Sequence, residues 1–248
     1  MRGKKRVKVS IAAIVSIGVL SSPVMAKCND GKAQKLVKAY SQIVGCKDNS
    51  IIFRDGTKMS YDDGRQKSFQ ELLNHPDIED MFKYPYPRGA ASFAPPKYDP
   101  GRIRYEPFFR KIYGNSAAAV RKNLTTINWF GKAVKVTKVN GVAGQLLAVE
   151  RELKKLPKSY WKYLTPIGGT FTWRKIAGTN RLSVHSFGAA IDINVKYSAY
   201  WRWSKGGKYR NQIPKEIVNI FERHGFIWGG KWYHYDTMHF EYRPELLY

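Results

Sequence analysis

The chain has 248 residues, of which 43% are hydrophobic and 14% aromatic. This composition supplies the core of one large domain or two small ones, and it excludes a disordered chain. The formal net charge of +24 favours polyanionic surroundings. Because the sequence contains no nucleic-acid-binding motif, nucleic acid is not the expected partner.

Residues 1–26 have the pattern of a signal peptide. A basic stretch, 2–8, precedes a short apolar run, 9–20, and small residues lead to a cleavage site after Ala26. An uncleaved membrane anchor is the alternative, although the run is short for a bilayer span. We therefore expect export to the periplasm or cell envelope. There the basic chain would meet anionic envelope polymers, unless its charge is only a solvated surface.

Two cysteines remain after cleavage, Cys28 and Cys46. In an oxidising compartment an even pair predicts a disulfide, whereas two free thiols are the alternative. Neither cysteine lies in a CxxC motif, so we assign them no chemistry.

The first half of the chain alternates short helices with hairpins. Apolar spacing predicts a helix over 27–47, and Asp55-Gly56 predicts a hairpin turn within 51–61. Ser68 and Glu71 have capping-box spacing and predict a helix start, followed by a short helix over 77–82. Further on, helices are predicted over 108–113 and 117–124, strands within 125–139, and a helix over 142–156.

The segment 84–107 interrupts this pattern with six prolines and two glycines. Such a composition predicts an extended loop. A loop of this length is either functional, as a groove wall or lid, or a covering segment packed on the core. Its arginines, Arg88, Arg102 and Arg104, would suit contacts with glycans or carboxylates.

Four potential metal-site residues lie in two stretches of the second half. The first stretch contains His185 and Asp192, and the second contains Asp236 and His239. Three N/O ligands with one open position are typical of catalytic zinc, and a nearby base takes the proton of the attacking water. Alternation over 190–194 and 239–242 predicts two strands, with Asp236 in the loop before the second.

The spacing of these residues resembles that of a known family. The motif reads Ser183-x-His185-x-x-Gly188-x-Ala190-x-Asp192, followed by Asp236-x-x-His239. It is similar to the zinc peptidases of the D-alanyl-D-alanine carboxypeptidase (VanY-type) family, from about Leu146 to the C-terminus. The resemblance implies a hedgehog-like fold, with zinc (Zn2+) bound by His185, Asp192 and His239 and with Asp236 as the base.

The family also has an arginine on a strand ahead of its first zinc histidine. Arg174, on a strand predicted over 170–174, is the better match, and Arg181 is the second. Either guanidinium would stabilise an oxyanion, hold a substrate carboxylate, or form a structural ion pair. Ser183 is expected to position substrate or brace the ligand loop, and Glu241 to be a partner behind a ligand. His75, His224 and His234 are interpreted as ordinary polar residues.

These observations predict an α+β protein with a small antiparallel sheet and flanking helices. Residues 27–140 would form an N-terminal mixed extension packed on a catalytic domain, 141–248, because no flexible linker divides them. A monomer is expected. The resemblance implies a protein that hydrolyses peptidoglycan stem peptides as a carboxypeptidase. An L-alanyl-D-glutamate endopeptidase is the related alternative, and the aspartate at position 236 favours it. A non-catalytic, zinc-containing wall-binding module is the alternative from another class.

Overall fold

The structure is a computed structural model that describes residue 28 and residues 30–89, 94–204 and 209–248. It combines short helices with three small antiparallel sheets, which confirms the predicted α+β class. The expected signal peptide and its alternative, the anchor, lie outside the described residues. No helix among the described residues is both long and apolar enough to cross a bilayer.

The N-terminal region consists of one helix and a three-stranded sheet. Helix α1 (Lys32–Ala39) is followed by β1 (Ile43–Lys47), β2 (Ser50–Phe53) and β3 (Lys58–Ser60), in the order β1-β2-β3. The hairpin predicted around Asp55-Gly56 is confirmed. The helix predicted over 27–47 was too long, because Tyr40 is extended and the next residues pair with β2. The disulfide between Cys28 and Cys46 is confirmed.

Helix α2 (Phe69–Asn74) begins at the predicted capping box of Ser68 and Glu71, and the short helix near residue 80 is the 3-10 helix η1 (Glu79–Phe82). The proline-rich segment then crosses the molecule without a helix or strand in its described part until α3 (Glu106–Tyr113). Buried contacts hold it in place: the Tyr86 hydroxyl donates to Glu222, and the carbonyl of Gly101 accepts from Arg243. The segment thus packs on the core, and Arg102 and Arg104 within it also line a cavity wall.

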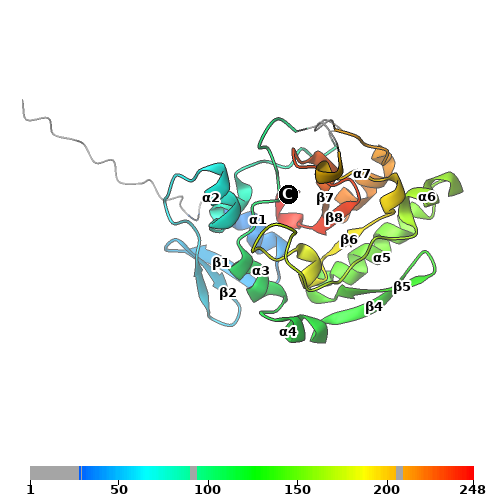
Figure 1. Cartoon of the computed structure of the whole chain (residues 1–248). Helices are drawn as coiled ribbons and strands as arrows, with labels where there is room; N and C mark the ends of the chain where they lie inside the picture. The colour runs from blue at the N-terminus through cyan, green and yellow to red at the C-terminus, as the bar shows by residue number, and fades with distance from the viewer. Residues whose placement is uncertain (1–27, 29, 90–93, 205–208) are drawn as a thin grey trace, which may run out of the picture.

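The middle of the chain adds α4 (Ala117–Lys122) and a hairpin of β4 (Leu124–Trp129) and β5 (Lys132–Thr137). Helix α5 (Val142–Leu153) and the short α6 (Trp161–Leu164) follow. Figure 1 shows this hairpin and α5 at one end of the molecule and the sheet with β1 and β2 at the other. In the described part of the chain, the other 3-10 helices are η2 (Val139–Gly141), η3 (Lys158–Tyr160), η4 (Val184–Phe187), η5 (Val195–Tyr197), η6 (Trp201–Trp203), η8 (Gly229–Lys231) and η9 (Pro244–Leu246).

A third sheet lies between these two ends and carries the predicted ligands. Its antiparallel order is β6 (Ala190–Asp192), β8 (His239–Tyr242) and β7 (Phe226–Trp228). Helix α7 (Lys215–Arg223) packs against it, and the Phe221 and Phe240 rings stack with centroids 3.9 Å apart. The aromatic stack anchors the middle strand, β8, to the helix layer.

The strand predicted over 170–174 is not formed. These residues instead follow the η4 turn: the Thr172 amide donates to the carbonyl of His185, and the Arg174 amide to the Ser186 hydroxyl. Only isolated bridges flank the segment, between Gly169 and Asp192 and between Lys175 and Leu182. Alternation of polar and apolar residues was therefore misleading here, because the partner is a helical turn rather than a neighbouring strand.

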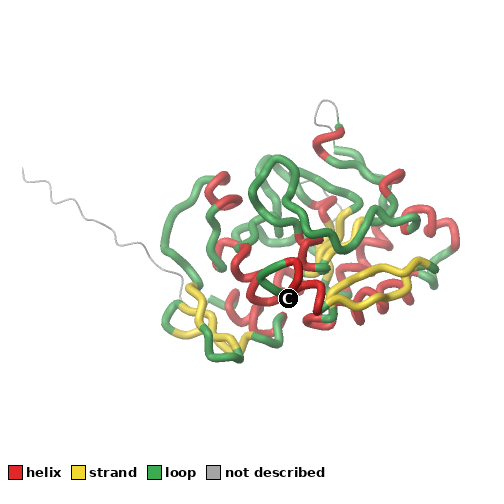
Figure 2. Tube along the Cα trace, turned by 60° about the horizontal axis from the view of Figure 1, so that its bottom comes forward, coloured by secondary structure: helices red, strands yellow, loops and turns green. Residues whose placement is uncertain are grey.

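One apolar cluster includes residues from both parts of the chain, from Leu36 in α1 to Phe240 in β8. A buried polar contact also joins them, because the Tyr40 hydroxyl donates to Glu245 at 2.7 Å. Figure 2 shows loops connecting the small sheets across the middle of the molecule. The division into an extension, 27–140, and a catalytic domain, 141–248, stays a prediction, and the two parts share this core.

Candidate metal centre

His185 lies in the buried turn η4, whose geometry fixes its ring. The Ser183 hydroxyl caps the turn and accepts from the His185 amide at 3.3 Å. Nδ1 of His185 lies 2.5 Å from the carbonyl oxygen of Thr170, which can only accept, so Nδ1 carries the proton. The lone pair of His185 is therefore on Nε2, the nitrogen that faces the other predicted ligands.

The turn after His185 requires glycine. Gly188 ends η4 with φ +67°, in the left-handed region that favours glycine. A Cβ there would lie 2.7 Å from Leu124 Cδ2 and 3.0 Å from the Thr137 amide nitrogen. The chain can thus reverse against the β4–β5 hairpin and enter β6 with Asp192 directed back to His185.

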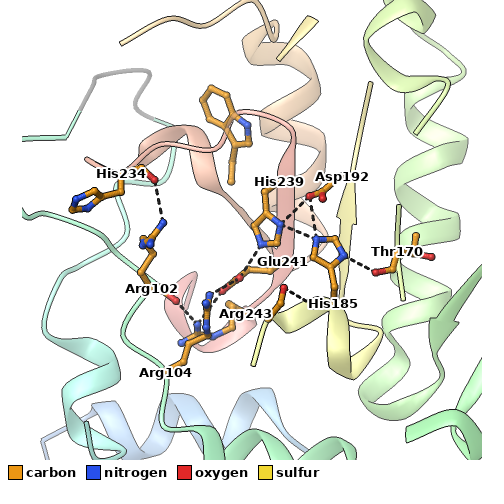
Figure 3. Close-up of polar contacts among 12 residues, drawn as sticks. Arg102, Arg104, Thr170, His185, Asp192, His234, His239, Glu241 and Arg243 are labelled. Atoms are coloured by element: carbon orange, nitrogen blue, oxygen red, sulfur yellow. Dashed lines mark hydrogen bonds and ion pairs between the residues drawn. The ribbon is translucent and has the colours of Figure 1, made fainter. Parts of the chain in front are cut away.

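Asp192 and His239 are direct neighbours in the sheet. They face each other in the register of β6 and β8. Asp192 Oδ1 lies 3.1 Å from Nε2 of His185 and 3.0 Å from Nδ1 of His239, and these two nitrogens are 3.2 Å apart. Figure 3 shows both imidazoles turned toward this carboxylate. Three donor atoms from η4, β6 and β8 therefore converge on one point.

The spacing of these atoms fits zinc. Tetrahedral zinc with ligands at about 2.0–2.2 Å places neighbouring ligand atoms roughly 3.3–3.5 Å apart. The observed separations, 3.0 to 3.2 Å, are within a few tenths of an ångström of that range. Two neutral imidazoles and one carboxylate are also a donor set that suits zinc.

The electrostatics of the same atoms favour a bound cation. Burial would raise the pKa of Asp192, but the charges and hydrogen bonds of His185 and His239 hold it well below its usual range. Burial would lower the pKa of His239, yet its bonds to Asp192 and Glu241 raise it to about 10. A positive charge is thus strongly favoured among these atoms, as either a proton or a metal ion.

A network of buried charges holds His239 from behind. Its Nε2 lies 3.0 Å from Oε2 of Glu241, which can accept the Nε2 proton, so Nδ1 is the nitrogen that would bind a metal ion beside Asp192. Arg104 donates to the same Oε2 at 2.9 Å, and Arg243 donates to the other oxygen at 3.1 Å (Figure 3). These charges hold the pKa of Glu241 well below its usual range, although burial alone would raise it. Glu241 is therefore an ionised acceptor that fixes the ring.

Asp236 lies in the predicted loop before β8. Its amide donates to the carbonyl of Gly229 at 3.0 Å, and a Cβ on Gly229 would lie 2.6 Å from the Asp236 carbonyl oxygen. Oδ1 of Asp236 is buried without a hydrogen-bond partner among the described residues. Burial, and then the charge of Asp192, raises its pKa to about 6. An orphaned carboxylate oxygen beside a ligand set suits a proton acceptor.

A cavity of about 290 Å³ contains the three ligands and Asp236. The exposed Arg174 and the buried Ser183 also line this cavity. Arg181 does not line it and lies in the wall of an adjoining cavity. The remaining walls are Arg102, Arg104, Ile176, Ala177, Val184, Tyr200, Trp203, Trp232 and Met238. The structure thus brings together every predicted site residue except Arg181.

Residues 177–242 match the D-alanyl-D-alanine carboxypeptidase family model. The match spans both halves of the paired motif and supports the resemblance found in the sequence. It also supports a peptidase function related to peptidoglycan, and a metallopeptidase in particular. Comparisons with curated proteins and with solved structures gave no match.

Sequence reasoning did not place three residues that the cavity depends on. Arg102 and Arg104 were noted only as possible ligand contacts, yet they reach the wall from the proline-rich segment. Thr170 supplies a backbone carbonyl, which no side-chain pattern can reveal. Of the other histidines, His224 and His234 lie within 2.6 Å of Glu152 and Asp99, so the structure confirms them as satisfied polar residues.

Proposed function

We propose that the protein is an exported zinc metallopeptidase that hydrolyses peptidoglycan stem peptides, with D-alanyl-D-alanine carboxypeptidase-like activity. The observation that carries the proposal is the convergence of His185, Asp192 and His239. Beside them lies Asp236, whose Oδ1 has no hydrogen-bond partner among the described residues. The family match over 177–242 supports the substrate class. The signal-peptide pattern of residues 1–26 supports export to the periplasm or envelope.

In this proposal His185, Asp192 and His239 hold the zinc ion. Bound zinc supplies a Lewis acid that lowers the pKa of water towards neutrality and polarises a carbonyl. Asp236 accepts the proton of the attacking water and then delivers it to the leaving amine. Arg174 lines the same cavity and would hold the negative charge of the oxyanion or of a substrate carboxylate. Ser183 braces the ligand turn through the His185 amide.

The test incubates pentapeptide muropeptides with the protein, with and without a zinc chelator, and identifies the products by mass spectrometry. Chelator-sensitive loss of one terminal alanine is the expected result. Chelator-sensitive release of an internal fragment would instead assign an endopeptidase. Unchanged muropeptides in the presence of bound zinc would reject both peptidases and favour a wall-binding module.

The variant Asp236→Asn separates an enzyme from a binder. We expect it to keep its zinc and to lose nearly all turnover, because the amide cannot accept the water proton. A matched control is Asp55→Asn, which changes an exposed carboxylate in the distant β2–β3 turn. Equal turnover in the two variants would remove Asp236 from the proposed mechanism.

A further inference from the structure

A second cavity, of about 940 Å³, adjoins the metal cavity. Arg102 and Arg104 line both cavities and form their common wall, and Arg181 lines the second one only. We propose that these three arginines bind a carboxylate of the substrate peptide at a distance from the bond that is cleaved. The inference rests on the proposed peptidase function and adds a site that recognises one chemical group of the substrate.

The first argument is that the arginines lack enough carboxylate partners of their own. Arg181 forms no ion pair within the described part of the chain, and its Nε and Nη1 are buried without hydrogen-bond partners. Among the residues that the structure describes, the Arg102 side chain donates to the backbone carbonyl of His234, and its Nε has no hydrogen-bond partner. A buried guanidinium without acceptors is costly, so this arrangement favours an anionic ligand.

The nearby carboxylates are already occupied. Asp99 lies 3.8 Å from Nε of Arg102, too far for a hydrogen bond, and its Oδ2 lies 2.6 Å from Nδ1 of His234. Glu241 pairs with Arg104 but also holds His239 and Arg243. Two carboxylates, each shared with another charged or titratable partner, therefore face three arginines at the cavity wall.

The second argument is the repulsion among the arginines themselves. Burial, and then the charges of Arg104 and Arg102, lower the pKa of Arg181 to about 10, and the charge of Asp99 opposes them only in part. Like charges in such proximity oppose one another unless an anion lies between them. The packing holds them there, because the Leu182 amide next to Arg181 donates to Glu106 of α3 at 2.9 Å.

The third argument concerns the ligand. Guanidinium groups bind carboxylates through paired, charge-assisted hydrogen bonds. Trp201 and His234 form part of the same cavity, with ring centroids 4.6 Å apart, and supply a surface for the ligand's carbon atoms. Since the two cavities share a wall, a peptide whose scissile bond lies at the metal would reach Arg181 with another of its residues. A carboxylate on that residue is the group that the arginines can recognise.

The experiment measures binding by calorimetry and uses the Asp236→Asn background, so that the peptide stays intact. The probes are a stem peptide with all carboxylates free and a series in which each carboxylate remote from the scissile bond is amidated singly. Arg181→Gln is compared with Arg151→Gln, which removes the same charge from an exposed position on α5. Thermal unfolding of each variant verifies that it is folded.

We expect one of the amidations to weaken binding about 10-fold, the usual size of a charged hydrogen bond. Arg181→Gln should bind the free peptide about 10-fold more weakly and should be nearly indifferent to that amidation, whereas Arg151→Gln should behave as its parent. Equal losses on amidation in Arg181→Gln and its parent, or no loss for any amidation, would overturn the proposal. Inorganic phosphate that binds as tightly as the peptide, with no effect of amidation, would also overturn it.

Turnover distinguishes this inference from the proposed function. If no peptide is cleaved by the protein with Asp236 intact but the binding pattern holds, the peptidase fails and the carboxylate site stands. If cleavage occurs and the binding pattern is absent, the carboxylate site fails and the peptidase stands.

Discussion

Two parts of this molecule gather residues of metal-ligand type, but they differ in the cation that they hold. Near α2, Asp63, Asp77 and Asp80 surround the ammonium of Lys67 at 2.9, 3.0 and 2.6 Å. In the central sheet, His185, Asp192 and His239 converge, and no lysine or arginine forms an ion pair with Asp192 among the described residues.

The difference shows that a cluster of acids does not by itself indicate a metal site. The Lys67 side chain is fully buried and satisfies its carboxylates, so that cluster needs no ion. In the central sheet, Arg104 and Arg243 form ion pairs with Glu241, which orients the His239 imidazole. These arginines therefore do not neutralise Asp192. The donor set of two imidazoles and one carboxylate is therefore the better candidate for a metal site.

The largest expected effect is that of removing a ligand. His185→Ala should reduce bound zinc from about one ion per chain to nearly none and abolish turnover, because two remaining ligands hold zinc poorly. Zinc content is measured by plasma emission spectrometry after dialysis. His224→Ala is the matched control, since His224 pairs with Glu152 outside the cavity. Full zinc content in His185→Ala would contradict the assignment.

The next effect concerns the other cluster. Lys67→Met should destabilise the fold by about 3–5 kcal/mol, because it leaves buried carboxylates without their cation. Its zinc content should be unchanged. Denaturant unfolding measures the difference, with Lys135→Met, at an exposed position of β5, as the control. A loss as small as that of the control would mean that the aspartates are satisfied without the lysine.

A smaller effect on zinc affinity is expected from Glu241, which contacts the ligand His239. Glu241→Gln should weaken zinc binding about 10- to 100-fold, as removal of such acceptors typically does. Competition with a chromophoric chelator measures the dissociation constant. Glu152→Gln provides the comparison, because Glu152 contacts His224 in the same way outside the site. Zinc affinity equal to that of the parent would show that the backbone alone orients His239.

The smallest effect tests exposure within the Lys67 cluster. The Asp63 side chain is 37% exposed, whereas that of Asp80 is 9% exposed. Asp63→Asn should therefore cost about 1 kcal/mol or less, and Asp80→Asn distinctly more. Both values come from urea unfolding. Equal losses would indicate that solvent does not screen the outer ion pair.

The sequence predicted the metal centre better than the surroundings of that centre. His185, Asp192 and His239 were found because ligand spacing and strand alternation are local patterns. The position of Arg181 outside the metal cavity was missed, because it depends on how the 175–182 loop packs against α3. The strand expected over 170–174 did not form because its amides donate to the η4 turn instead of to a neighbouring strand. Helix 27–47 ended early because tertiary strand pairing overrode its apolar spacing.

The ion pairs behind β8 have a consequence for modularity. Arg104, which holds Glu241, and Tyr40, which binds Glu245, both precede residue 141. A fragment that begins there would strip two buried carboxylates of these partners, although the fragment carries every zinc ligand. The half that contains the candidate ligands is thus not an independent module. A fusion of this half to another protein would also have to include Arg104 and Tyr40.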